Sequence, residues 1–181
     1  TSPNHVREAN GIVIFRPGVK AAAFAEGADN LVVIGRAGAG CDKIDMDACT
    51  AADVAVFNAP DTLTHATASS AFLLILALAK KLSQHQRMVR EGRWDLQPVT
   101  MGDDLPGKTL GIVGLGKSGV ELARLVQPFH MRTIAFSPSA DRHEAASLGV
   151  MLVETLEELF AESDFVSLHA KLTDDKRGMI K

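Results

Sequence analysis

A short glycine motif in the second half of the chain has a spacing that can bind phosphate. Residues 114–119, Gly-Leu-Gly-Lys-Ser-Gly, match the pattern G-x-G-x-x-G between an apolar run at 109–113 and a helical run at 117–127. In that context the first glycine permits a tight turn, the second lets a pyrophosphate approach the backbone, and the third lets the helix pack closely on the strand. The motif predicts a dinucleotide site, and the alternative is an ordinary glycine turn. The glycines of the predicted site are Gly114, Gly116 and Gly119.

The position that would bind the ribose of such a ligand is not acidic. The fingerprint places an acidic residue at the end of the second strand, about 20 residues further on. Here that strand ends at Phe136, so the position falls on Ser137. A serine hydroxyl can bind a ribose but does not repel a 2′-phosphate, and Arg142 nearby could meet one. The alternative is that Arg142 is a solvated helix residue, so both NAD and NADP are candidate cofactors.

The elements around this motif alternate between short apolar strands and helical stretches. Continuous apolar runs predict parallel strands covered on both faces, and repeated strand–helix–strand units indicate an α/β fold. The predicted strands are 11–15, 31–34, 54–57, 109–113, 132–136, 150–153 and 164–168. The predicted short helices are 20–26, 45–52, 117–127, 141–148 and 155–162.

One longer helix is predicted between the two groups of strands, from Thr64 to about Arg90. Its first half is apolar on every side, which predicts burial between two domains, and its second half is polar. Residues 91–107 then read as a connecting arm. We therefore expect a domain at 1–63, an interdomain helix at 64–92 and a second domain at 93–181.

Composition and charge narrow the class of protein. The 181 residues are 46% hydrophobic and 23% charged, which is ordinary globular composition and excludes disordered, collagenous and coiled-coil classes. A net charge of −3 without a basic stripe argues against a nucleic-acid partner. The most apolar run, 71–79, is shorter than the roughly 20 residues that cross a bilayer, so no membrane partner is expected.

The cysteines and the chain ends carry further expectations. Cys41 and Cys49 do not form a C-x-x-C pair, so no metal site is expected and a reducing, cytoplasmic location is the simplest interpretation. The chain begins at Thr1 rather than Met and runs to Lys181 without a stop signal. Both ends are therefore expected to be cut from a longer protein.

Four strings occur in order along the chain: 30–45, 58–60 followed by 64–78, 105–116 (Leu-Pro-Gly-Lys-Thr-Leu-Gly-Ile-Val-Gly-Leu-Gly) and 163–169 (Ser-Asp-Phe-Val-Ser-Leu-His). Together they resemble the D-isomer-specific 2-hydroxyacid dehydrogenases over nearly the whole chain. The resemblance implies two doubly wound parallel-sheet domains, a flavodoxin-like substrate domain and a Rossmann NAD(P)-binding domain, both incomplete here. It implies hydride transfer between NAD or NADP and a small D-2-hydroxy or 2-oxo acid, with 3-phosphoglycerate as one candidate. It also implies a homodimer.

The resemblance also assigns site residues. Ala39 and Gly40 match a loop whose N–H groups meet the substrate carboxylate, and Ala39 also meets the cofactor edge. Thr67 matches a hydroxyl residue near the nicotinamide. Lys117 and Ser118 match the two residues at the pyrophosphate.

Further matches lie at the ends of two strands. Ser137 matches the ribose position, which is usually Asp in the family, and Ala170 matches a position that lines the adenosine pocket. His169 could act as a general base, but its motif position favours a structural or cofactor-side role. The family's His-x-Pro is His169-Ala170-Lys171 here, so this loop is expected to be less rigid.

No catalytic residue is expected within the chain itself. The family's catalytic Arg, Glu and His lie C-terminal to the segment that matches Lys181, and its opening strand lies before Thr1. His65 is expected near the cleft rather than in catalysis. Arg36 could bind a substrate anion or bridge its loop to Asp42, and the residues do not decide between these.

Two other functional classes stay open. One is an interaction protein that senses NAD(P) on the same fold, as corepressor-like relatives do. The other is a methyl-transferring or hydrolytic enzyme that uses a Rossmann-like domain for a different nucleotide.

Overall fold

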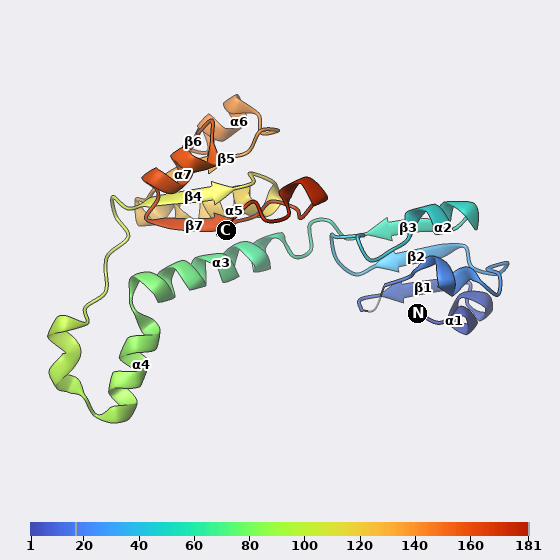
Figure 1. Ribbon diagram of the computed structural model, residues 1–181, viewed down its shortest axis with the longest axis horizontal. Coiled ribbons are helices and arrows are strands. Elements are labelled where there is room, and N and C mark those ends of the chain that lie inside the picture. Colours follow the sequence, from blue (N-terminus) through green and yellow to red (C-terminus); the bar gives the residue numbers. More distant parts are fainter. Residues whose placement is uncertain (17, 181) are drawn as a thin grey trace. The chain divides into compact units, whose positions relative to one another are not determined.

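Two separate parallel sheets form in the chain, which a computed structural model describes for residues 1–16 and 18–180. They belong to two compact units, Thr1–Leu63 and Thr64–Lys181 (Figure 1). The helix at the start of the second unit packs against α5 (Lys117–Val126), which covers one face of that unit's own sheet. The fold class is therefore α/β with parallel strands, as predicted.

The first unit has its strands in the order β1-β2-β3, in sequence order and all parallel. Val6, Ala23 and Cys49, one from each helix of this unit, form one buried cluster with Ile34 of the central strand. The opposite sheet face stays open among the described residues, where Phe57 is 66% exposed. Coverage of both faces, as predicted, is therefore wrong for this sheet. Its elements are α1 (Pro3–Glu8), β1 (Gly11–Ile14), η1 (Ala21–Phe24), β2 (Val33–Arg36), α2 (Met46–Ala51) and β3 (Ala55–Asn58).

The second unit has the strand order β6-β5-β4-β7, again all parallel. The chain order reverses beside β4, which opens a crevice at the carboxyl ends of β4, β5 and β7. Ile112 packs into the cluster shared with α3 (Thr64–Ala79) and α5, and Val113 into the cluster shared with α7, so helices cover both faces. The elements are β4 (Thr109–Val113), α5 (Lys117–Val126), η3 (Gln127–Phe129), β5 (Arg132–Phe136), α6 (Arg142–Ser147), β6 (Val150–Leu152), α7 (Leu156–Glu162), β7 (Phe165–Leu168) and η4 (Asp174–Lys176).

The single long helix predicted from Thr64 to about Arg90 is wrong. Two helices occupy this stretch, α3 (Thr64–Ala79) and α4 (Leu82–Glu91), and they are bent by 58° to each other. Lys81 between them has a left-handed φ of +49°. Among the described residues no single helix is long and apolar enough to cross a membrane, and only this bent pair passes that test together.

The prediction that the apolar helix α3 is buried on every side is also wrong. Ala68 and Ile75 are buried in the cluster shared with α5, whereas Leu74 and Leu78 are 64% and 70% exposed. After α4, the 3₁₀-helix η2 (Trp94–Val99) completes an arm that Figure 1 shows apart from the sheet of its unit. Trp94 in this arm is 67% exposed.

Helix caps and strand ends largely follow the predictions. Asp45 and Thr155 accept hydrogen bonds from the N–H groups three residues on, at 3.0 and 3.1 Å, and so cap α2 and α7. The Glu158 carboxylate accepts from the N–H of Glu154 rather than from that of Thr155. The predicted helix at 20–26 is one 3₁₀ turn, and the strand predicted at 31–34 begins at Val33.

Candidate dinucleotide-binding site

The three glycines of the motif have three different surroundings. A Cβ on Gly114 would lie 2.6 Å from the Ala170 nitrogen, and one on Gly119 would lie 2.4 Å from the Gly114 carbonyl oxygen. A Cβ on Gly116 would meet nothing within 4 Å. The first and third glycines therefore satisfy close packing, while the second leaves open space beside the N-terminus of α5. This is the arrangement that the motif predicts for a phosphate site.

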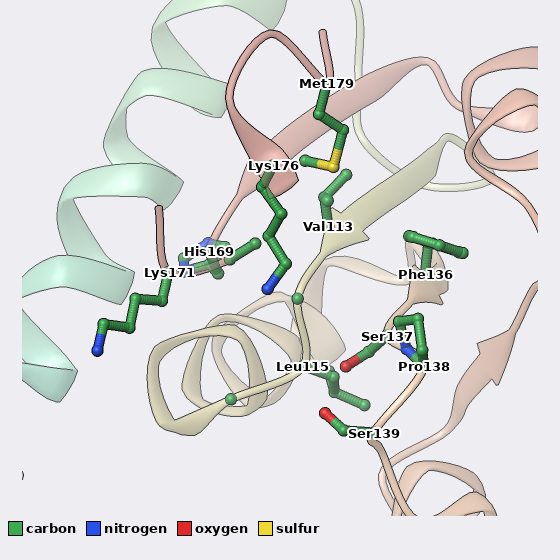
Figure 2. Close-up of a pocket in the computed structure, with 13 residues that line it drawn as sticks. Val113, Leu115, Phe136, Ser137, Pro138, Ser139, His169, Lys171, Lys176 and Met179 are labelled. Carbon is green, nitrogen blue, oxygen red and sulfur yellow. The ribbon is translucent and has the colours of Figure 1, made fainter. Parts of the chain in front are cut away.

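A cavity of about 330 Å³ lies at the carboxyl ends of β4, β5 and β7. It brings together several of the residues predicted from sequence, which arrive from three strand ends (Figure 2). These are Gly114, Gly116, Ser137, His169 and Ala170. The neighbouring Lys117 and Ser118 form the first turn of α5.

The charge around this cavity is positive. Lys171 and Lys176 line it, and no carboxylate does so among the described residues. Figure 2 shows the Lys176 amine pointing from η4 toward the loop between Val113 and Leu115. Lys176 was not predicted from the sequence, because it follows the last strand in a segment that contains no recognised motif. An anion is the ligand that this combination of amines and helix N–H groups favours.

The predicted ribose position opens onto a second, smaller cavity. Ser137 lines it together with Arg142 and Glu154, in a volume of about 220 Å³. The Arg142 guanidinium donates to the Glu154 carboxylate at 2.5 Å, and this hydrogen bond raises the pKa of Arg142. Arg142 is exposed at the start of α6 and forms a surface ion pair with Glu154, so it is a solvated helix residue, as one alternative predicted, and is not an unpaired phosphate ligand. Sequence reasoning missed Glu154, although it follows β6, whose carboxyl end adjoins that of β5 in the parallel sheet.

His169 follows β7 and holds two hydroxyl groups. Its Nδ1 lies 2.9 Å from Oγ of Ser118, and its Nε2 lies 2.9 Å from Oγ of Ser167. Burial lowers the pKa of the imidazole, which favours the neutral ring. Among the described residues no carboxylate hydrogen-bonds to the ring, which differs from the usual arrangement of a general base; one nitrogen faces Ser118 of the glycine motif and the other faces Ser167 of β7.

Two other predicted residues on α3 lie away from the cavity lining. Thr67 is exposed and does not line either cavity of the nucleotide unit. His65 Nδ1 lies 2.9 Å from Glu121 Oε1 on α5, a contact that lowers the pKa of the Glu121 carboxyl. His65 therefore links two helices.

The predicted substrate loop follows β2 in the first unit. The Asn58 amide donates to the carbonyl of Ala39 at 2.8 Å, and Arg36 Nε donates to that of Gly40 at 3.0 Å. Among the described residues no acceptor takes the N–H of Ala39 or Gly40. Arg36 therefore braces the loop through backbone carbonyls rather than through Asp42, and the loop N–H groups are available to an anion.

Comparison with known proteins identifies the family. The family model described as D-isomer specific 2-hydroxyacid dehydrogenase, NAD binding domain, matches residues 72–181. The chain therefore belongs to the D-isomer specific 2-hydroxyacid dehydrogenases, and the predicted family and NAD-type cofactor are confirmed at that level.

The chain spans about a third to a half of the curated relatives it matches. It is 40% identical over 159 residues to D-3-phosphoglycerate dehydrogenase of Archaeoglobus fulgidus, covering 88% of this chain and 30% of that protein. It is 37% identical over 170 residues to the enzyme of that name from Methanocaldococcus jannaschii, covering 93% and 32%. It is 40% identical over 158 residues to glyoxylate reductase of Korarchaeum cryptofilum, covering 86% and 47%.

Solved structures show the same fold. The TT0316 protein of Thermus thermophilus matches with a TM-score of 0.86 and 30% identity, covering 98% of this chain and 56% of that one. Apo D-mandelate dehydrogenase of Rhodotorula graminis gives 0.85 and 28%, covering 98% and 58%. D-lactate dehydrogenase of Aquifex aeolicus, complexed with NAD and lactic acid, gives 0.85 at 24% identity, covering 97% and 52%, which shows the fold alone.

Proposed function

We propose that this chain binds NAD or NADP at the carboxyl edge of its second sheet, as part of an oxidoreductase that transfers a hydride between that cofactor and a small D-2-hydroxy acid. The observation that carries the proposal is the open space at Gly116, between two glycines that packing requires. Family membership supports the cofactor class. When bound, the nicotinamide supplies the hydride chemistry, and the protein supplies binding and orientation.

The residues present fit the parts of such a cofactor. The N-terminus of α5 and the Lys176 amine would hold the pyrophosphate, since both favour negative charge at the glycine loop. The Ser137 hydroxyl would bond the adenosine ribose, next to the paired Arg142 and Glu154. His169 and Ala170 would border the adenosine side, and Thr67 is proposed near the nicotinamide.

The substrate is proposed to be a small acid held through its carboxylate. The N–H groups of Ala39 and Gly40 in the first unit have the chemistry to bind a carboxylate, and Arg36 stabilises the loop that carries them. The names of the relatives include phosphoglycerate dehydrogenase and glyoxylate reductase, so more than one 2-hydroxy acid is supported. We propose 3-phosphoglycerate as the first acid to test.

A second copy of the chain is the proposed macromolecular partner. The exposed leucines of α3 and the exposed Trp94 of η2 are apolar side chains of the kind that a subunit interface covers. This proposal is independent of the cofactor site, because none of these side chains lines the two cavities described above.

Calorimetric titration of the 181-residue chain with NADH tests the cofactor site, with S-adenosylmethionine as the alternative nucleotide. We expect NADH to bind and Gly116→Ala to weaken that binding at least about tenfold. Binding of S-adenosylmethionine instead would favour the methyl-transferring class and contradict the proposal. The 181-residue chain by itself is expected to show no turnover, because the family's catalytic Arg, Glu and His match none of its residues. Oxidation of NADH with a panel of 2-oxo acids, measured on a protein that also carries those three residues, would separate an oxidoreductase from an interaction protein, which binds the cofactor without turnover.

A further inference from the structure

The His169 ring links two elements that meet at the glycine loop. Ser167 lies in β7, two residues before His169 and on the same side of the strand, and Ser118 is the second residue of α5. Both hydroxyl oxygens lie 2.9 Å from a ring nitrogen, Ser167 from Nε2 and Ser118 from Nδ1. The start of α5 is therefore joined to the end of β7 through one imidazole.

The backbone supports the same junction. The N–H of His169 donates to the carbonyl of Val113 at 2.8 Å, which extends the pairing of β4 and β7 beyond the strand end. Gly114 approaches the backbone of Ala170 so closely that a Cβ would not fit. The ring is half-buried between fixed backbone segments, so its two nitrogens have fixed partners.

A neutral imidazole carries one N–H, which allows two arrangements of the hydrogens. With the hydrogen on Nδ1, the ring donates to Ser118, Ser167 donates to Nε2, and the Ser118 hydroxyl hydrogen is free to turn outward. With the hydrogen on Nε2, the ring donates to Ser167, and Ser118 must donate to Nδ1. Only the first arrangement leaves Ser118 a donor for a ligand at the start of α5.

We propose that His169 is a positioning residue for the cofactor, which holds Ser118 as a hydrogen-bond donor toward a phosphate at the N-terminus of α5. The inference rests on the proposed cofactor site. An anion there favours the first arrangement, in which the Ser118 hydroxyl donates to the anion. In the second arrangement a lone pair of Ser118 would face the phosphate oxygen and repel it. The bound phosphate and the Nδ1–H form of His169 therefore stabilise each other.

The charged groups around the ring are consistent with this role. Lys171 and Lys176 line the same cavity, and Lys117 precedes Ser118 on α5. The acid nearest along α5 is Glu121, one turn after Ser118, and its carboxylate is in contact with His65 of α3. The Ser118 hydroxyl would therefore donate directly to the phosphate, in a site whose surrounding side chains are mainly positively charged.

The tautomer of His169 is the direct readout. We would record ¹⁵N imidazole spectra of the histidine-labelled 181-residue chain during titration with NADH. The fraction of His169 in the Nδ1–H form is expected to rise to nearly complete as NADH binds, while His130, which is exposed, does not change. This measurement needs no variant and would not move if His169 only joined α5 to β7.

Substitutions test the same step through affinity. The amide nitrogen of Asn lies close to the place of Nδ1, and that of Gln close to the place of Nε2. We expect His169→Asn to keep NADH affinity within about threefold and His169→Gln to weaken it about tenfold, the loss of roughly one hydrogen bond. Ser118→Ala should weaken NADH affinity as much as His169→Gln does. The double variant that carries both substitutions should bind NADH no more weakly than either single variant. His130→Asn is the matched control and should bind as wild type does.

The outcomes separate the two proposals. If NADH does not bind the wild-type chain, the proposed function and this inference both fail. If NADH binds and Gly116→Ala weakens that binding at least about tenfold, the cofactor site stands. If the His169 spectrum then stays unchanged, or if the His169→Asn and His169→Gln variants bind NADH equally, the positioning role of His169 is overturned and the proposed cofactor site still stands.

Discussion

The backbones of Gly114 and Ala170 touch at the carboxyl edge of the second sheet, where a Cβ on Gly114 would lie 2.6 Å from the Ala170 nitrogen. Gly114 also has φ +93°, a conformation that side chains rarely adopt. Gly116, two residues on, has φ −84° and open space around it. Within one motif, therefore, Gly114 is required by the packing of the fold, whereas Gly116 is required by the approach of a ligand.

Gly114→Ala should destabilise the second unit without any ligand present. We expect its free energy of unfolding to fall by at least about 2 kcal/mol, because a left-handed φ costs roughly 1–2 kcal/mol and an overpacked contact about 1–3 kcal/mol. Chemical unfolding followed by circular dichroism measures the change. A variant as stable as wild type would show that the loop can move away from Ala170.

Gly116→Ala is the matched control for that experiment. Its unfolding free energy should stay within about 1 kcal/mol of wild type, since only a helix-capping glycine is replaced. Its NADH affinity should nevertheless fall at least about tenfold, because the added methyl group occupies the approach of the pyrophosphate. Undiminished NADH binding by this variant would contradict the site.

The choice between NAD and NADP should be weak in the wild-type chain. Ser137 does not repel a 2′-phosphate, and Arg142 lies beside it, but Arg142 is already paired with Glu154. Ser137→Asp should strengthen NAD binding by about tenfold or more through a charge-assisted bond to the ribose, and weaken NADP binding. Paired calorimetric titrations of both cofactors measure the change. A wild-type preference for NAD above about a hundredfold would show that Ser137 is not the discriminator.

Glu154→Gln tests whether the pairing of Arg142 with Glu154 limits the binding of a 2′-phosphate. It removes a negative charge beside the ribose position and leaves Arg142 with a weaker partner. We expect NADP to bind more tightly to this variant, by up to about tenfold, and NAD to bind as before. If both cofactors change equally, Glu154 affects the site as a whole rather than the 2′-phosphate.

The parts of the fold that the sequence predicted correctly are those with local causes. The strands at 109–113 and 132–136 have the predicted bounds, because parallel strands buried on both faces are continuous apolar runs. The glycine motif and the caps at Asp45 and Thr155 depend on neighbours within a few residues. Each therefore leaves a pattern that can be read from the chain.

Features that depend on distant segments were missed. The break after α3 contains neither Gly nor Pro, and the N–H of Asp103 caps it by donating to the carbonyl of Ala79 at 2.8 Å. Gly102 packs so closely there that a Cβ would lie 2.6 Å from the same carbonyl oxygen. The pairing of Arg142 with Glu154 likewise joins the start of α6 to the segment that follows β6. Such contacts follow from tertiary packing, which no local pattern encodes.

A homodimer should form through the arm and the exposed face of α3. Trp94 and Leu78 are 67% and 70% exposed in the single chain, and covering them would be favourable. Sedimentation should show a dimer for wild type, and Trp94→Ala should weaken it at least about tenfold, as expected for an interface tryptophan. Phe160→Ala, an exposed aromatic residue on α7, is the control and should leave the dimer intact. A monomeric wild type would rule out the interface.

Acid should destabilise the fold in part through His169. Burial lowers the pKa of its imidazole below the ordinary value of about 6.5, whereas the unfolded chain titrates near that value. Below about pH 6.5 the unfolded state therefore binds more protons, so the free energy of unfolding falls as the pH is lowered toward the pKa of the folded state.

Chemical unfolding from about pH 5 to about pH 8 would measure this dependence. His169→Asn removes the ionisable ring while keeping a donor near Ser118, so its unfolding free energy should depend less steeply on pH below about 6.5. His130→Asn is the control for replacing a histidine away from the site, because Asn tolerates the left-handed φ of +54° at this position. Parallel curves for wild type and His169→Asn would mean that the buried ring takes up its proton as readily in the folded state as in the unfolded chain. Serine hydroxyls accepting from both ring nitrogens would then offset the cost of burial.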